Sequence, residues 1–136
     1  MPFSGLIEKG VYVIHGMGTD IFETERMAKL VARGRPYLET IFTDIEIEYC
    51  ESKARPSEHY AARYAAKEAV LKALGTGWRD GLSFSDIEIR NDELGKPQVF
   101  LHGKVKELCD RLQIRQTLVS LSHTRETAIA VAILEN

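Results

Sequence analysis

An alanine-rich segment near the middle of the chain, residues 57–74, most constrains how this sequence can fold. Alanine has the strongest intrinsic preference for the α-helix, and Gly75, directly after the segment, is the residue type that most often ends one. Ser57 follows Pro56 and is a suitable N-cap. We therefore expect one long helix. Small residues recur along it every four positions, which indicates that another part of the chain approaches it closely: Ala65, Ala69 and Ala73.

Shorter patterns surround this segment, and nothing between them has the composition of a linker or a repeat. Alternating or β-branched residues predict strands at 11–15, 87–90, 97–102, 117–122 and 128–134. Apolar spacing predicts helices at 22–32 and 104–112, and a capping box predicts another that begins after Thr43, with Glu46. Turns are expected at 16–20 and 91–95. This order of elements predicts an α+β class, with helices packed on a small, largely antiparallel sheet.

The length of 136 residues suits a single domain, 1–136. A net charge of −2 argues against nucleic acid as a partner. The longest apolar run, 127–134, is too short to cross a bilayer, and the first ten residues lack the apolar core of a signal peptide. Cys50 and Cys109 have no CxxC partner and are interpreted as free thiols. We expect a cytoplasmic protein that contacts no membrane.

A carboxylate follows the first strand pattern, in Gly16-Met17-Gly18-Thr19-Asp20. Glycines permit close approach of the backbone to a ligand, and carboxylate oxygens suit Mg²⁺. The alternative is that Asp20 only caps the following helix, a role that Asp often fills. The residues alone leave both interpretations open. The segment lacks the third glycine of the dinucleotide-binding fingerprint.

Glu68 and Lys72 are four residues apart, so they lie one turn apart on the same face of the long helix. The simplest interpretation is a surface ion pair that contributes roughly a few tenths of a kcal/mol. The alternative is a binding site, because Gly75-Thr76-Gly77 follows on the same helix and supplies backbone N–H groups that a phosphate could use. That segment is too short for a Walker loop.

The segment Ser120-Leu121-Ser122-His123-Thr124 places a serine beside a histidine. Adjacent side chains of a strand point apart, so the two would not act as nucleophile and base. A polar turn and a ligand-binding turn both remain open. The other histidines lack zinc-ligand spacing. The acidic run after Thr43 is interpreted as a solvated helix face: Asp44, Glu46, Glu48 and Glu51.

Taken together and in this order, these segments resemble the holo-[acyl-carrier-protein] synthase family of 4′-phosphopantetheinyl transferases over residues 11–135. Gly18-Thr19-Asp20-Ile21 with Arg26 is similar to the family's first motif. The second and more specific motif is Arg63-Tyr64-Ala65-Ala66-Lys67-Glu68-Ala69, followed by Lys72-Ala73-Leu74-Gly75-Thr76-Gly77. Tyr64 stands where Phe is common in the family, and residues 1–10 form an N-terminal extension.

The resemblance implies transfer of 4′-phosphopantetheine from coenzyme A to a serine hydroxyl of an apo acyl carrier protein, with 3′,5′-ADP as the second product. It implies that Asp20 and Glu68 bind Mg²⁺ and that Lys72 contacts the phosphates and assists the leaving group. Glu68, directly or through a water, would accept the serine proton. Asp20, Glu68 and Lys72 thus form the expected catalytic set. Further contacts to coenzyme A are expected from the following residues: Arg63, Lys67, Gly75, Thr76 and His123.

Between residues 23 and 36 the chain carries four basic residues against two acidic ones: Arg26, Lys29, Arg33 and Arg35. Carrier proteins of this kind are acidic, so a basic stripe would steer the partner, in a salt-sensitive way. The alternative is an ordinary amphipathic helix with a charged outer face. The family resemblance also implies a homotrimer with its sites at subunit interfaces. Whether the carrier belongs to fatty acid biosynthesis or to another pathway is left open.

Overall fold

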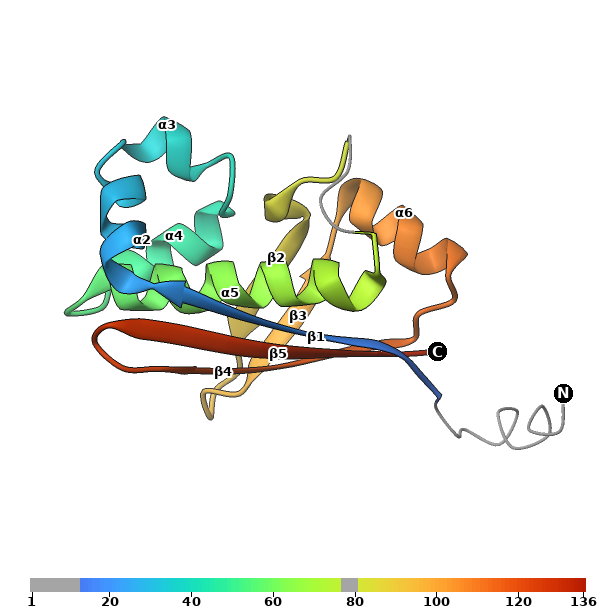
Figure 1. Ribbon diagram of the computed structural model, residues 1–136. Helices are drawn as coiled ribbons and strands as arrows, with labels where there is room; N and C mark the ends of the chain where they lie inside the picture. Colours follow the sequence, from blue (N-terminus) through green and yellow to red (C-terminus); the bar gives the residue numbers. More distant parts are fainter. Residues whose placement is uncertain (1–12, 77–80) are drawn as a thin grey trace, which may run out of the picture.

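The long helix expected from the alanine-rich segment is α5 (Pro56–Leu74), and it runs through the centre of the molecule (Figure 1). The computed structural model describes residues 13–76 and 81–136. Gly75 ends α5 in the left-handed conformation, with φ 78°, as predicted. The N-cap is Arg55 and not Ser57, because Pro56 takes the first helical position, where a missing N–H breaks no helical hydrogen bond.

Within the described ranges, the strands form two antiparallel sheets. A three-stranded sheet has the order β1 (Ile14–Glu23), β5 (Thr127–Glu135) and β4 (Gln116–His123). A separate hairpin pairs β2 (Ile87–Asn91) with β3 (Pro97–Leu101). The predicted α+β class is confirmed, and four of the five predicted strands are present with ends within one residue of those expected. The first was predicted at 11–15, and its residues 11 and 12, like the N-terminal extension 1–10, lie outside the described residues.

The remaining helices lie on the same side of the three-stranded sheet as α5 (Figure 1). Near the start of α5 are α2 (Thr24–Val31), α3 (Arg35–Leu38) and α4 (Asp44–Glu51). Near its end is α6 (Gly103–Arg111), and the 3-10 turn η1 (Phe84–Asp86) precedes β2. The capping box predicted at the start of α4 is present, since Thr43 and Glu46 bond each other's backbone N–H.

Strand β1 is longer than expected, because it continues through residues 16–20, which the sequence predicted as a turn. Its glycines let the strand cross α5 at very short range. A Cβ on Gly16 would lie 2.2 Å from the carbonyl oxygen of Ala73, and one on Gly18 would lie 2.2 Å from that of Ala69. The close approach expected at the helix alanines is therefore a contact with β1, and the glycines, which were expected to admit a ligand, admit the backbone of α5.

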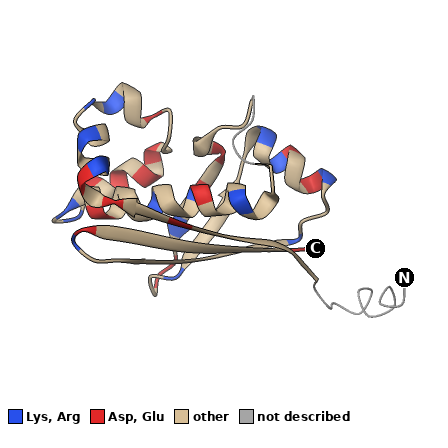
Figure 2. Cartoon of the chain, viewed as in Figure 1, with Lys and Arg blue, Asp and Glu red and all other residues tan. Residues whose placement is uncertain are grey.

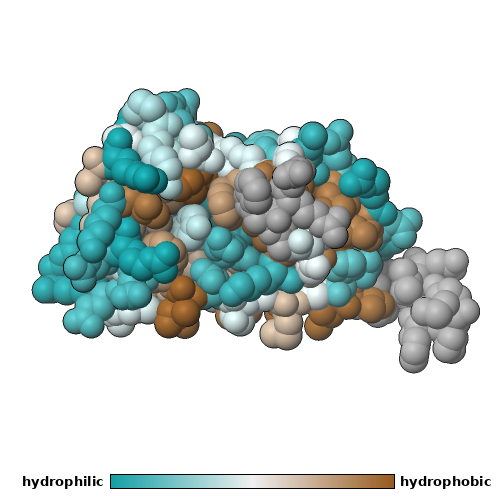
Figure 3. All heavy atoms as spheres, turned by 45° about the horizontal axis from the view of Figure 1, so that its top comes forward, coloured by the Kyte–Doolittle hydropathy of each residue, from teal (hydrophilic) through white to brown (hydrophobic). Residues whose placement is uncertain are grey.

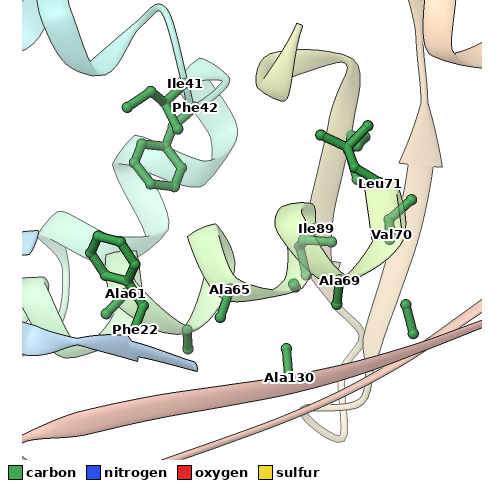
Figure 4. Packing of buried hydrophobic residues seen from close by; sticks show 14 of the residues in the cluster. Phe22, Ile41, Phe42, Ala61, Ala65, Ala69, Val70, Leu71, Ile89 and Ala130 are labelled. Atoms are coloured by element: carbon green, nitrogen blue, oxygen red, sulfur yellow. The ribbon is translucent and has the colours of Figure 1, made fainter. Parts of the chain in front are cut away.

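Alanines also line the contact between α5 and β5. Ala65 and Ala69 of α5 and Ala130 of β5 are fully or almost fully buried and face one another in Figure 4. Side chains this small allow a helix and a sheet to pack closely, which explains why the middle of α5 is so rich in alanine. The larger core side chains, such as Phe22 and Phe42, fill the space toward α2 and α4.

A buried ion pair joins α4, α5 and β2. Lys67 Nζ lies 2.7 Å from Oε1 of Glu46, and both side chains are 0% exposed. Lys67 also donates to the backbone carbonyl oxygens of Phe84 and Ile87, and Glu46 accepts from the backbone N–H of Ile89. The interpretation of the acidic run as a solvated face is therefore wrong at Glu46, because a cation from α5 neutralises it inside the core.

Two further expectations concern the cysteines and the membrane. Cys50 and Cys109 are both free, as predicted, and both are buried. Burial raises the pKa of the Cys50 thiol to about 12 and that of Cys109 to about 11. Across residues 13–76 and 81–136, no helix has the length and apolar character needed to cross a membrane.

Candidate active site

The centre of the candidate site is an ion pair between β1 and α5. Lys72 Nζ lies 3.0 Å from Oδ1 of Asp20 and donates to the carbonyl oxygen of Thr19 at 2.9 Å. Asp20 lies inside β1, and Glu23 is the N-cap of α2, so the capping alternative for Asp20 is wrong. Lys72 reaches Asp20 across the strand–helix contact, so its ion-pair partner is Asp20 and not Glu68, which helical spacing alone favoured.

This ion pair borders a cavity of about 280 Å³ between β1, β5 and α5. The Lys72 side chain is 53% exposed, whereas the Asp20 side chain is 14% exposed. The ammonium group is therefore accessible to a ligand in the cavity, while the carboxylate is largely shielded. The cavity is lined by the following residues: Thr19, Asp20, Ile21, Lys72, Ile129, Ala130 and Val131.

Glu68, half-buried, lies one helical turn before Lys72, and Tyr64 lies one turn before Glu68. The pKa of Tyr64 is raised, first by burial, then by the charge of Glu68 and a hydrogen bond to it, and further by the charge of Asp20. The charges of both carboxylates therefore raise the pKa of the same hydroxyl group. The structure thus brings Lys72 into direct contact with Asp20, and Glu68 lies one helical turn from Lys72.

The two carboxylates are a donor set that fits Mg²⁺. This ion is usually bound through one or two carboxylates, with waters and substrate phosphates completing its coordination. Asp20 comes from β1 and Glu68 from α5, so the site depends on the packing of two distant segments. In residues 13–76 and 81–136, no three His, Cys, Asp or Glu side chains gather as a metal-binding group. The pair therefore suits an ion that is shared with a phosphate-bearing substrate.

Two of the expected coenzyme A contacts are buried. Lys67 is fully engaged by Glu46 and two carbonyl oxygens inside the core, so the prediction that it contacts coenzyme A is wrong. Arg63 is 3% exposed, donates to Oδ1 of Asn91 and stacks on the ring of Tyr49 at 3.9 Å. Its Nε is buried and has no hydrogen-bond partner among the described residues.

His123 lies far from the catalytic set in this chain. It ends β4, and its Nδ1 lies 3.3 Å from Oε1 of Glu58, near the start of α5. Because β5 separates β4 from β1, His123 and Asp20 lie at opposite edges of the sheet. Gly75 and Thr76 follow the other end of α5. One copy of the chain therefore does not bring all the expected coenzyme A contacts into one site.

The expected basic stripe is exposed on α2 and the turn after it, at the left of Figure 2. Arg26 stacks on Phe22 at 4.7 Å, and Arg33 stacks on Tyr37 at 4.5 Å. Arg35 begins α3 and forms an ion pair with Asp44 at 3.0 Å, so part of its charge is already neutralised. Figure 3 shows that this end of the molecule is mostly hydrophilic, with hydrophobic groups along the middle of the same face.

Comparisons with known proteins agree with this geometry. Residues 16–132 match the model of the 4′-phosphopantetheinyl transferase superfamily. The holo-[acyl-carrier-protein] synthase of Geobacter sulfurreducens is 49% identical over 124 residues, which are 90% of this chain and 98% of the relative. The crystal structure of the Neisseria meningitidis synthase has a TM-score of 0.83 at 34% identity, covering 91% of this chain and 100% of that one. A Helicobacter pylori synthase in complex with coenzyme A has a TM-score of 0.76 at 34% identity, and the match covers 87% of this chain and 98% of that one.

The chain belongs to the 4′-phosphopantetheinyl transferase superfamily. Its curated relatives are named holo-[acyl-carrier-protein] synthase, and the chain is an enzyme of that kind, a phosphopantetheinyl transferase. The family expected from the motifs is therefore confirmed.

Proposed function

We propose that this enzyme transfers the 4′-phosphopantetheine group of coenzyme A to a serine hydroxyl of an apo acyl carrier protein in the cytoplasm, with Mg²⁺, and releases 3′,5′-ADP. The observation that carries the proposal is the accessible Lys72 ammonium, paired with Asp20 at a cavity. Glu68 lies one helical turn before Lys72, and a cation with two nearby carboxylates suits a pyrophosphate and its metal ion. The likeness to a synthase in complex with coenzyme A supports the choice of donor.

In this reaction the serine oxygen attacks the β-phosphorus of coenzyme A. A new bond between oxygen and phosphorus forms as the bond to the bridging oxygen breaks, and 3′,5′-ADP leaves with the electron pair. Lys72 would offset the negative charge that grows on the leaving phosphate. Glu68, directly or through a water, would accept the serine proton. Bound Mg²⁺, held by Asp20 and Glu68, would supply further neutralisation of the pyrophosphate charge.

We also propose that the enzyme works as a homotrimer. The face of the three-stranded sheet turned away from α5 carries apolar side chains in adjacent rows, with Met17 beside Ile133 and Ile21 beside Ile129. Ile21 is 66% exposed and Met17 is 63% exposed. A continuous apolar face of this kind is typical of a protein interface. Association would also let His123 of one copy approach the Asp20 edge of another, which a single copy does not achieve.

The exposed side of α2 is the proposed docking surface for the acidic carrier protein. Arg26, Lys29 and Arg33 are exposed there without an ion-pair partner among the described residues, whereas Arg35 is paired with Asp44. We therefore assign most of the steering to the first three. Because charges that steer a partner are screened by salt, the KM for the carrier should rise with ionic strength more than the KM for coenzyme A.

The test is intact-mass spectrometry of an apo acyl carrier protein incubated with this enzyme, coenzyme A and Mg²⁺. The expected result is a mass gain of one phosphopantetheine, abolished by EDTA and restored by Mg²⁺. Asp20→Ala and Glu68→Ala should each slow transfer by about 100-fold or more. Glu23→Ala, at an exposed position of the same strand as Asp20, is the control. Binding of coenzyme A without transfer to fatty-acid or polyketide carriers would instead indicate a binding module.

A further inference from the structure

Glu58 is a buried carboxylate in the first turn of α5, and each of its two oxygens has a partner. The side chain is 10% exposed; Oε2 lies 3.7 Å from Nε of Arg55, and Oε1 lies 3.3 Å from Nδ1 of His123. A buried charge needs such partners, because without them the loss of its hydration is not compensated. The first turn of a helix also favours a negative charge. The carboxylate is therefore fixed before any ligand binds.

The contact with Glu58 determines how the His123 ring presents its two nitrogens. An ionised carboxylate only accepts hydrogen bonds, so Nδ1 of His123 carries a proton directed toward Oε1. The second nitrogen, Nε2, then points away from Glu58. The His123 side chain is 31% exposed, and Nε2 has no partner in residues 13–76 and 81–136. The nitrogen that a ligand can use is therefore Nε2.

A second imidazole restricts the orientation of the His123 ring. His59, the residue after Glu58, lies edge-on to His123, with 5.1 Å between ring centroids and 68° between the planes. Tyr49 of α4 packs against His59 in turn, at 6.0 Å and 75°. A half-turn of the His123 ring would replace Nδ1 by a carbon atom and lose the contact with Glu58. The ring therefore has one favoured orientation.

Cations lie close to these rings. Arg55, beside Glu58, is 54% exposed. Lys53 and Arg63 lie over the ring of Tyr49, at 4.6 Å and 3.9 Å from its centroid, and the charges of both act on His59. A surface with such an excess of positive charge suits a phosphate-bearing ligand.

We propose that Glu58 is a positioning residue, which holds Nδ1 of His123 and thereby presents Nε2 to the nucleotide end of coenzyme A. The inference rests on the proposed function only in naming that ligand. Glu58 acts through His123, because its own carboxylate is buried and would repel a phosphate group. Loss of a hydrogen bond to a charged group typically changes an equilibrium constant by about 10-fold or more.

The test compares Glu58→Leu, which removes the acceptor, with Glu58→Gln, which keeps a carbonyl oxygen at the same place. The first readout is the Kd of 3′,5′-ADP, measured by calorimetry on the full-length protein. Glu58→Leu should raise it by about 10-fold, and Glu58→Gln should restore most of the affinity. In transfer assays, Glu58→Leu should raise the KM for coenzyme A by a similar factor and change kcat much less.

The matched control is Asp110→Leu, which removes a carboxylate of α6 that forms an ion pair with Lys106 at 3.0 Å. It should leave the Kd of 3′,5′-ADP unchanged. In the His123→Gln background, Glu58→Leu should cause no further loss of affinity. An unchanged Kd in Glu58→Leu, or an equal loss with and without His123, would overturn the inference.

A second readout does not depend on the ligand. Nitrogen-15 NMR at pH 8.5, where an ordinary imidazole is neutral, shows which ring nitrogen carries the proton. In the parent protein we expect the proton of His123 on Nδ1, and in Glu58→Leu we expect it to redistribute toward Nε2. A His123 with an unprotonated Nδ1 in the parent protein would overturn this inference alone. Absence of transfer by a parent protein with the expected protonation would overturn the proposed function instead.

Discussion

At the scale of single residues, the buried pair Glu46–Lys67 shows how a charged motif residue can serve the core. Lys67 stands beside Glu68 in the sequence but points to the other side of α5, where it meets Glu46 and carbonyl oxygens of η1 and β2. Three donors of one ammonium group thereby find three acceptors. Such a pair fixes the arrangement of α4, α5 and β2 more than it adds net stability.

Removing one partner of this pair should be costly. Lys67→Met leaves the Glu46 carboxylate buried without its cation, which should lower the free energy of unfolding by about 3–5 kcal/mol and the melting temperature by roughly 10 °C. The double variant Glu46→Gln with Lys67→Met buries no charge and should regain part of the loss. Thermal melts followed by circular dichroism measure both. A double variant no more stable than Lys67→Met would contradict the argument.

His59 should make the stability depend on pH. Its pKa is lowered, first by burial and then by the neighbouring charges of His123, Lys53 and Arg63. The folded protein therefore disfavours the proton, whereas the unfolded chain accepts it near the ordinary value of about 6.5. The contribution of His59 to stability is present above that pH and is lost as the pH falls below it. The melting temperature should fall from pH 7.5 to pH 5.5, and it should fall less in His59→Gln. If the melting temperature fell equally with pH in the parent protein and in His59→Gln, His59 would not be the cause of the pH dependence.

At the scale of elements, the contact between β1 and α5 determines where the side chains of the candidate site lie. Gly18 lets the strand cross the helix near Ala69, and Asp20 follows two residues later on the same face. The same crossing brings Lys72 within 3.0 Å of Asp20. The glycines of the first motif and the alanines of the second are therefore two sides of one contact, and this contact joins Asp20 to Lys72, two of the proposed catalytic residues.

Gly18→Ala tests this role of the crossing. The added Cβ would lie 2.2 Å from the Ala69 carbonyl oxygen, so the strand must move away from the helix. Overpacking of this kind should cost about 1–3 kcal/mol of stability, and transfer should slow because Asp20 moves with the strand. Glu23→Ala, in the same strand, is the control and should change neither. Thermal melts and transfer rates measured well below the melting temperature separate the two effects. If Gly18→Ala transferred the group as fast as the parent protein, the crossing of β1 and α5 would not determine the position of Asp20.

At the scale of the whole molecule, the apolar outer face of the three-stranded sheet should control assembly. Light scattering coupled to size-exclusion chromatography should give three times the 15.3 kDa of the single chain. Met17→Lys places a charge on this face, outside the lining of the cavity, and should yield monomers with much reduced transfer. Leu94→Lys, at a 96% exposed position between β2 and β3, should stay assembled and active. If Met17→Lys still assembled, another surface would form the interface.

Local pattern in the sequence predicted the α+β class and the long helix, because helix propensity and caps act over a few residues. The family was predicted from the resemblance of the motifs, and so were the catalytic roles of Asp20, Glu68 and Lys72. Local pattern by itself left Asp20 open between a cap and a ligand and favoured a surface pair for Glu68 and Lys72. The same local reasoning ended the first strand too early and placed Glu46 on the surface. At both positions a contact between distant segments outweighs the local preference.

Only the tertiary structure decided which charged side chains share a site. Lys72 and Lys67 belong to one helix and look equivalent in the sequence, yet one faces a cavity with Asp20 and the other is buried with Glu46. Likewise, Asp20 and His123 lie at opposite edges of one sheet, which strand order alone determines. Partners more than twenty residues apart are selected by packing and by the cost of burying an unpaired charge, neither of which a local pattern contains.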